Sequence, residues 1–256
     1  MESAVHRLWD ELADFGAARV DDALNHLMCA LCDMAQGTDV YWFGTLRLDS
    51  LASNDPVRGW RVGIIRNLRP SPKADTAVRE QNDNVDAGAI DITILRNLES
   101  AGSFRANRLR DLADESWFQG DYYRNYYLAV GNSDSVYVAF PVSDDAESWF
   151  AIHRAPDQPP YTEAERDQLA YALRGLKWFH HQLLLSHGLQ LVTSPLTGSE
   201  RRVLHLLLTG LTEKGIANQL DRSPNTVHVI VTQIFRKFGV KNRASLMAMW
   251  LGSAGK

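Results

Sequence analysis

A short run near the C-terminal end combines small polar, methyl-bearing and basic side chains, which together can contact the edges of DNA base pairs. If the residues after Ser223-Pro224 form a helix, one of its faces presents Asn225, His228, Val229, Thr232, Gln233 and Arg236. The methyl groups of Val229 can contact thymine, whereas Thr232 and Gln233 can donate to or accept from base edges. We therefore expect this face to bind double-stranded DNA.

The start of the same segment suits a phosphate group. Backbone N–H groups of Ser223 to Thr226 would lie free at a helix N-terminus, where they favour an anion. Basic residues add counterion release, so binding should weaken steeply with salt; they are Arg236, Lys237, Lys241 and Arg243.

Four helices are expected to position this face. Thr197 and Glu200 form a capping box, and the first helix after it has an apolar stripe of Val203, Leu204, Leu207 and Leu208. Thr212 caps a second helix with Ile216, Ala217 and Leu220 facing inward. Ser223 caps the third, Pro224 takes its first position, and its buried side is Val227, Val231, Ile234 and Phe238. Gly239 ends the third helix, and a short fourth helix spans residues 242–251.

This arrangement resembles the four-helix DNA-binding domain of the LuxR/GerE family. The resemblance covers about 55 residues and includes the Thr-Val pair at the start of the third helix and the Arg-Lys-Phe-Gly-Val sequence at its end. It implies that the third helix enters the major groove, with bases contacted by His228, Val229 and Thr232. It also implies phosphate contacts from Ser223, Thr226 and Lys237, helped by Thr212, and dimer contacts on DNA from Met247 and Trp250.

Two departures from the family pattern concern the helix-turn-helix itself. Gly215 stands where the family usually has Glu, and a helical glycine costs about 1 kcal/mol relative to alanine. His228 and Ile230 replace a usual Lys and His, which leaves the third helix poor in fixed positive charge. The alternative for this domain is a four-helix dimerisation unit that no longer binds DNA.

Charge and composition divide the chain in the same way. The 256 residues suffice for two domains, and 45% of them are hydrophobic, as in ordinary globular proteins. From Leu196 onward nine basic residues accompany three acidic ones, giving +6, while the rest of the chain carries −10. A basic module joined to an acidic one is typical of a polyanion-binding domain with a partner domain that does not touch nucleic acid. No stretch is long and apolar enough for a membrane span, so we expect a cytoplasmic protein.

The first part of the chain indicates an α+β sensor-like domain. Helical periodicity covers residues 5–34, with a break at Gly16, and strand character appears at 40–48, 60–67, 135–142 and 149–153. Helices are expected at 85–98 and from the capping box at Thr162 to His187. The second of these helices has apolar residues at heptad spacing, which fits either a short coiled coil or packing on the sheet. The residues of this apolar seam are Leu169, Ala172, Leu176, Phe179 and Leu183. This order of elements resembles GAF and PAS domains. The predicted organisation is a GAF/PAS-like domain at 1–191, a linker at 192–195, and an all-α domain at 196–256.

Aromatic residues are dense in this first domain and could line a pocket for an apolar or planar ligand. The candidate ligand contacts are Trp42, Trp60, Tyr123 and Tyr127. Arg61, Arg66 and His153 are candidate polar anchors. The alternatives are that the rings belong to the core and the polar residues to a solvated strand face.

Nothing in the sequence indicates catalysis. We find no convincing Ser/His/Asp or Cys/His set, no nucleotide-binding glycine motif, no metal-ligand pattern and no cofactor motif. The Trp-Tyr-Asp-Trp spacing of acyl-homoserine-lactone receptors fails around Trp42 and Asp55. We expect a one-component transcription regulator that binds promoter DNA as a homodimer and responds to a small molecule. The alternatives are a module that pairs with a related regulator and blocks it, and an enzyme with an appended helix-turn-helix.

Overall fold

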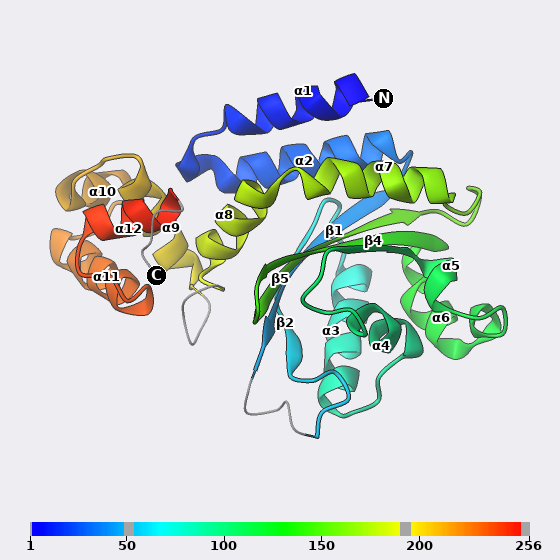
Figure 1. Cartoon of the computed structure of the whole chain (residues 1–256). Coiled ribbons are helices and arrows are strands. Elements are labelled where there is room, and N and C mark those ends of the chain that lie inside the picture. The colour runs from blue at the N-terminus through cyan, green and yellow to red at the C-terminus, as the bar shows by residue number, and fades with distance from the viewer. Residues whose placement is uncertain (1, 49–53, 190–195, 252–256) are drawn as a thin grey trace. The chain divides into compact units, whose positions relative to one another are not determined.

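The computed structural model describes residues 2–48, 54–189 and 196–251 (Figure 1). Its contacts form two compact units. Unit 1 consists of residues 1–9 and 25–177, and unit 2 consists of residues 10–24 and 178–256. The predicted linker at 192–195 lies outside the described residues, so that domain boundary stays a prediction.

Unit 1 is built on an antiparallel sheet of five strands in the order β2-β1-β5-β4-β3. The strands are β1 (Asp39–Arg47), β2 (Trp60–Asn67), β3 (Arg105–Arg108), β4 (Asp134–Ser143) and β5 (Ala146–Arg154). This confirms the α+β class and the four strands expected from sequence. The sequence did not indicate β3, because Arg-Ala-Asn-Arg at the sheet edge has neither an apolar run nor aromatic residues.

Helices cover both faces of this sheet (Figure 1). One face carries α3 (Pro72–Asp86), α4 (Ile92–Leu98) and α6 (Asp121–Tyr126), with the single turn α5 (Leu109–Leu112) near its β3 edge. The opposite face packs against α7 (Glu163–Arg174). Two further helices, α1 (Glu2–Ala13) and α2 (Val20–Met34), contribute residues to both units and are separated at Gly16, as the sequence predicted.

The expected helix at 85–98 was wrong in its extent. Helix α3 begins at Pro72, where Ser71 accepts a hydrogen bond from the Ala74 N–H at 3.2 Å. Gly88, with φ of +79°, lies in the break between α3 and α4. Ser71-Pro72 is the same helix-start signal as Ser223-Pro224, but the helix that follows is polar on most of its surface and so has little apolar periodicity.

The expected continuous helix from Thr162 to His187 is also interrupted. The capping box of Thr162 and Glu165 begins α7 as predicted, but α7 ends at Arg174 and α8 (Lys177–His187) follows. Gly175 lies at the break, and a Cβ there would stand 2.7 Å from two ring atoms of Trp9. The close approach of the Trp9 ring therefore requires glycine. All five residues of the predicted seam are buried, and α7 packs against the sheet.

Unit 2 is all-helical among its described residues. After α8 come α9 (Gly198–Leu208), α10 (Glu213–Gln219), α11 (Pro224–Lys237) and α12 (Arg243–Trp250), and residues 10–24 contribute the short turn η1 (Ala17–Arg19). The capping box of Thr197 and Glu200 is present, and the predicted apolar stripes of α9 and α11 are buried. None of the helices in the described parts of the chain has the length and apolar character needed to cross a bilayer.

Candidate nucleic-acid interface and ligand cavity

The third helix of the predicted helix-turn-helix, α11, has a sharply defined start. Ser223 Oγ accepts a hydrogen bond from the Thr226 N–H at 3.1 Å, and Pro224 occupies the first turn, where its missing N–H leaves no bond unmade. Ser223 and Thr226 also join their hydroxyls at 2.8 Å. Both residues are exposed, and Pro224 has no N–H, so the two hydroxyls and the Asn225 N–H are the groups placed where a phosphate could bind.

The two sides of α11 differ in the way the sequence predicted. Val227, Ile230, Val231, Ile234 and Phe238 are buried. The other side presents Asn225, His228, Val229, Thr232 and Arg236, all exposed, with Gln233 partly covered. Val229 leaves 55% of its surface open to solvent. An apolar side chain held outward on a capped helix suits contact with thymine methyl groups.

Two side chains on this face already have partners in the structure. His228 Nδ1 lies 3.0 Å from Glu213 Oε2, so the first residue of α10 fixes a predicted base-contacting residue. Thr232 Oγ1 donates to the carbonyl of His228 at 2.9 Å. The threonine hydroxyl therefore faces a base as an acceptor more readily than as a donor.

Lys237, a predicted phosphate contact, and Arg243, expected to add counterion release, both have partners inside unit 2. Lys237 Nζ donates to Glu200 Oε2 at 2.8 Å, and Arg243 donates to the carbonyls of Leu207 in the last turn of α9 and of Leu211 in the turn that follows. Burial would raise the pKa of Glu200, but hydrogen bonds from Lys237 and from the Thr197 backbone outweigh it and hold that pKa low. Lys237 and Arg243 thus hold unit 2 together.

The residues named for dimer contact lie on α12. Trp250 is only 4% exposed and packs into unit 2, and Met247 is half-buried. Thr212 performs its expected local role, because its hydroxyl accepts from the Gly215 N–H at 3.2 Å. The contacts of all these residues with DNA or a second copy stay predictions.

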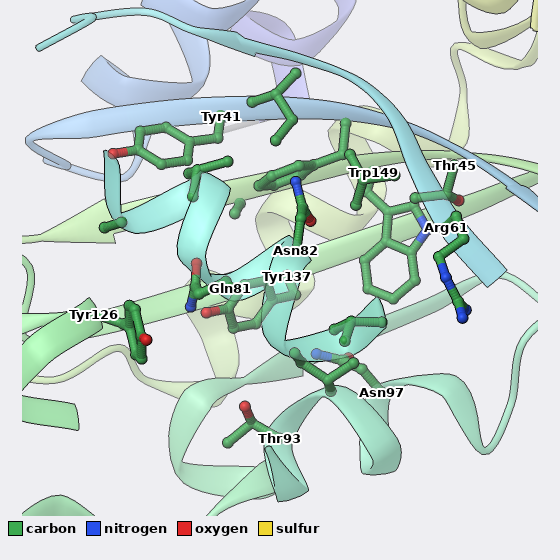
Figure 2. A pocket seen from close by; sticks show the side chains of 18 of the residues that line it. Tyr41, Thr45, Arg61, Gln81, Asn82, Thr93, Asn97, Tyr126, Tyr137 and Trp149 are labelled. Atoms are coloured by element: carbon green, nitrogen blue, oxygen red, sulfur yellow. The ribbon is translucent and has the colours of Figure 1, made fainter. Parts of the chain in front are cut away.

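A cavity of about 390 Å³ lies in unit 1, between the sheet and helices α3, α4 and α6 (Figure 2). Its size falls in the range typical of small-molecule sites. Of the four predicted ligand contacts, Trp60 and Tyr127 line it. Trp42 and Tyr123 do not line it, so their predicted role as ligand contacts gains no support from this cavity.

Trp42 is absent from the cavity wall because successive side chains of a strand point to opposite faces of the sheet. On β1 the cavity is lined by Tyr41, Phe43 and Thr45, so Trp42 must point to the opposite face. Trp42 is fully buried there and donates its indole N–H to Ser148 Oγ at 2.9 Å. Tyr123 belongs to α6 but uses its hydroxyl to donate to the Ser133 carbonyl at 2.8 Å.

Sequence reasoning missed most of the helical wall. Seven residues of α3 line the cavity, at helical spacing: Ala74, Ala77, Val78, Gln81, Asn82, Val85 and Asp86. Small alanines near the start of the helix leave room, and amides follow. Recognition of the Ser71-Pro72 start would have placed this stripe on one helix face and revealed it.

The cavity wall carries little net charge. Among the described residues that line it, only Arg61 and Asp86 are formally charged. Arg61 bonds to Asp86 and to Asp55, each at 2.7 Å, so it is neutralised within the protein. Burial raises the pKa of Tyr41 and Tyr137 to about 12 and lowers the pKa of His153 to about 3, so all three are neutral at pH 7.

A buried ion pair supports one side of the cavity. Arg105 and Glu147 bond through two N–O contacts of 2.8 and 2.7 Å, with 8% and 0% of their side chains exposed. The Arg105 guanidinium lies 4.4 Å from the Trp149 ring centre, and the Trp149 indole N–H donates to Glu147 at 2.9 Å. Arg105 also donates to the Asn97 carbonyl at 2.8 Å. The pair therefore fixes two residues that line the cavity, Trp149 and Asn97.

Comparison with known proteins identifies the C-terminal domain. Residues 194–250 match the model of the family described as bacterial regulatory proteins, luxR family. This part of the chain is therefore a LuxR-type helix-turn-helix domain, as its capped helices and buried stripes had indicated.

Two solved structures are similar over nearly the whole chain. One is the crystal structure of Escherichia coli SdiA in space group P6522, with 16% identity, a TM-score of 0.48 and coverage of 99% of both chains. The other is SdiA in complex with octanoyl-rac-glycerol, with 14% identity, a TM-score of 0.47, and coverage of 99% of this chain and 95% of that chain. No curated protein matches in a sequence search.

Proposed function

We propose that this protein is a DNA-binding transcription regulator of the one-component type, in which a ligand-binding unit modulates a LuxR-type helix-turn-helix. The observation that carries the proposal is the outward face of α11. That face holds exposed His228, Val229 and Thr232 on a helix whose start is fixed by Ser223 and whose opposite side is buried. Such a helix has the length and surface chemistry to enter a major groove.

The basic residues determine how binding depends on salt. Arg236 and Lys241 are exposed, and Lys214 and Arg222 add charge on α10 and the turn after it. Lys237 and Arg243 have internal partners, so we expect fewer counterions to be released than their number in the sequence would give. Affinity should fall with salt, but less steeply than for a domain with all six cations free.

The direct test is a titration of the full chain with its own promoter DNA at low ionic strength. A triple variant, His228→Ala with Val229→Ala and Thr232→Ala, should lose at least about 1–3 kcal/mol of sequence-specific binding and keep its weak general affinity. Asp157→Ala, at an exposed turn of unit 1, is the matched control and should bind as the parent does. Equal affinity of the triple variant and the parent for the promoter would refute the interface.

The proposal includes a homodimer acting in the cytoplasm. A two-fold pair of helix-turn-helix domains would place two α11 helices on successive turns of a near-palindromic site. Sedimentation of the protein with a full site should give two chains per DNA. One chain on the full site would contradict the dimer.

The alternative, a module that blocks a related regulator, gains no support from the comparisons.

A further inference from the structure

Asn97 is a buried amide with unused hydrogen-bonding capacity on the cavity wall. It is 7% exposed and lies on α4. Its side-chain oxygen accepts from Asn107 Nδ2 at 2.8 Å, which fixes the orientation of the amide. Among the described residues its own Nδ2 has no acceptor, so two N–H groups remain for whatever occupies the cavity.

Trp149 forms a flat aromatic surface on the same side of the cavity as Asn97 (Figure 2). The Arg105–Glu147 pair holds both, because Arg105 contacts the Asn97 carbonyl and the Trp149 ring while Glu147 accepts the indole N–H. Arg105 and Glu147 are thus positioning residues. A rigid donor beside a rigid ring is the arrangement that fixes the head of a ligand without further ordering cost.

The other residues that line the cavity indicate which chemical groups the ligand lacks. Its polar groups are mostly paired with one another: Gln81 donates to Tyr122, and Tyr127 and Tyr137 join hydroxyls at 2.6 Å. The one cationic side chain among the described lining residues, Arg61, is held between two carboxylates. A charged ligand group would lose its water without gaining an opposite charge, which is costly.

Resting on the proposed ligand-responsive function, we infer that the cavity binds an uncharged, mostly apolar molecule whose oxygen accepts a hydrogen bond from Asn97 Nδ2 beside Trp149. The ligand class is a neutral carbonyl or ether compound with an aliphatic or aromatic body. Amines and carboxylates are excluded from this end of the cavity.

Three probes that share one carbon count test this inference by calorimetry on the full chain. They are 1-phenylheptan-1-one, heptylbenzene, in which CH₂ replaces the carbonyl, and 4-hexylbenzoate, which is anionic. We expect the ketone to bind about three- to tenfold more tightly than heptylbenzene, the effect of one added hydrogen bond, and the benzoate to bind weakest. Equal affinity of ketone and heptylbenzene, tighter binding of the benzoate, or no binding of the ketone up to its solubility overturns the inference.

Variants test whether Asn97 causes the preference for the ketone over heptylbenzene. Asn97→Leu should abolish the preference for the ketone over heptylbenzene. Asn107→Ala removes the hydrogen bond that fixes the Asn97 amide but leaves that amide in the cavity, so it should weaken the preference without abolishing it. If Asn97→Leu fails to fold, Asn97→Asp, which retains the acceptor for Asn107 and removes the donor, takes its place. A preference that persists in a folded Asn97 variant contradicts the assignment.

The DNA titration described above, made without any probe, separates this inference from the proposed function. A chain that binds promoter DNA but shows no ketone preference refutes the ligand class alone. A chain that binds the ketone selectively but has no affinity for DNA refutes the proposed function and supports the cavity assignment.

Discussion

Two glycine-to-alanine substitutions in the helix-turn-helix should change stability in opposite directions. Gly215 lies inside α10, where glycine is about 1 kcal/mol less favourable than alanine. A Cβ at Gly215 would lie 3.5 Å from Leu211 Cδ2 and from Thr212 Oγ1, which is ordinary van der Waals contact. The Gly215 N–H would still donate to Thr212, so the helix cap is kept. Gly215→Ala should therefore stabilise unit 2 by about 1 kcal/mol.

Gly239→Ala is the matched contrast. No atom would lie within 4 Å of its Cβ, but φ is +63°, a left-handed conformation. Alanine there should cost about 1–2 kcal/mol from backbone strain alone.

The assay is urea unfolding followed by helical circular dichroism, with amide exchange in α10 and α11 as a local measure, because two compact units need not unfold together. We expect slower exchange in Gly215→Ala and faster exchange in Gly239→Ala, relative to the parent. Destabilisation by Gly215→Ala, or no loss of stability in Gly239→Ala, would refute the reasoning from local geometry.

Three further predictions follow from single contacts. Glu213→Gln removes a carboxylate 3.0 Å from His228 on the proposed DNA-binding face. The affinity for DNA, measured by fluorescence anisotropy, should therefore rise about two- to fivefold at low salt and less at high salt. An unchanged affinity would place Glu213 away from the DNA. Gly175→Ala forces a Cβ against the Trp9 ring and should destabilise unit 1 by about 1–3 kcal/mol in urea unfolding, whereas an unchanged midpoint would show that the ring moves freely. Burial lowers the pKa of His153 to about 3, below an unfolded value of about 6.5, so its contribution to stability is complete above pH 6.5 and is lost as the pH falls toward 3. His153→Gln should flatten that pH dependence in unfolding measurements at pH 7.5, 6 and 5, and parallel curves for parent and variant would contradict it.

The helix-turn-helix could be predicted from sequence because its signals are local. Capping residues such as Thr197 and Ser223 mark helix starts within three or four positions, and the 4, 3, 4 spacing of α11 identifies its buried side. The same approach succeeded for the start of α7 at Thr162. Local signals also gave the four apolar strands of the sheet.

The ligand cavity could not be predicted as well, because it depends on contacts between distant segments. Trp42 and Tyr41 are adjacent in sequence and equally aromatic, and only the pairing of β1 with β5 decides which one faces α3. Asn97 gives no sequence signal at all. Its role depends on Arg105 and Asn107 of β3 and on Glu147 of β5, none of which belongs to α4.

The membership of residues 10–24 in unit 2 affects how the chain folds. Asp21 bonds to Arg201 at 2.6 Å, and η1 packs against α9, although about 180 residues separate them in sequence. Residues 10–24 leave the ribosome long before residues 196–251. Closing so long a loop costs conformational entropy and slows association, so we expect unit 2 to be completed only after residues 196–251 have been synthesised. A fragment that begins at residue 196 would lack this N-terminal part of its own unit.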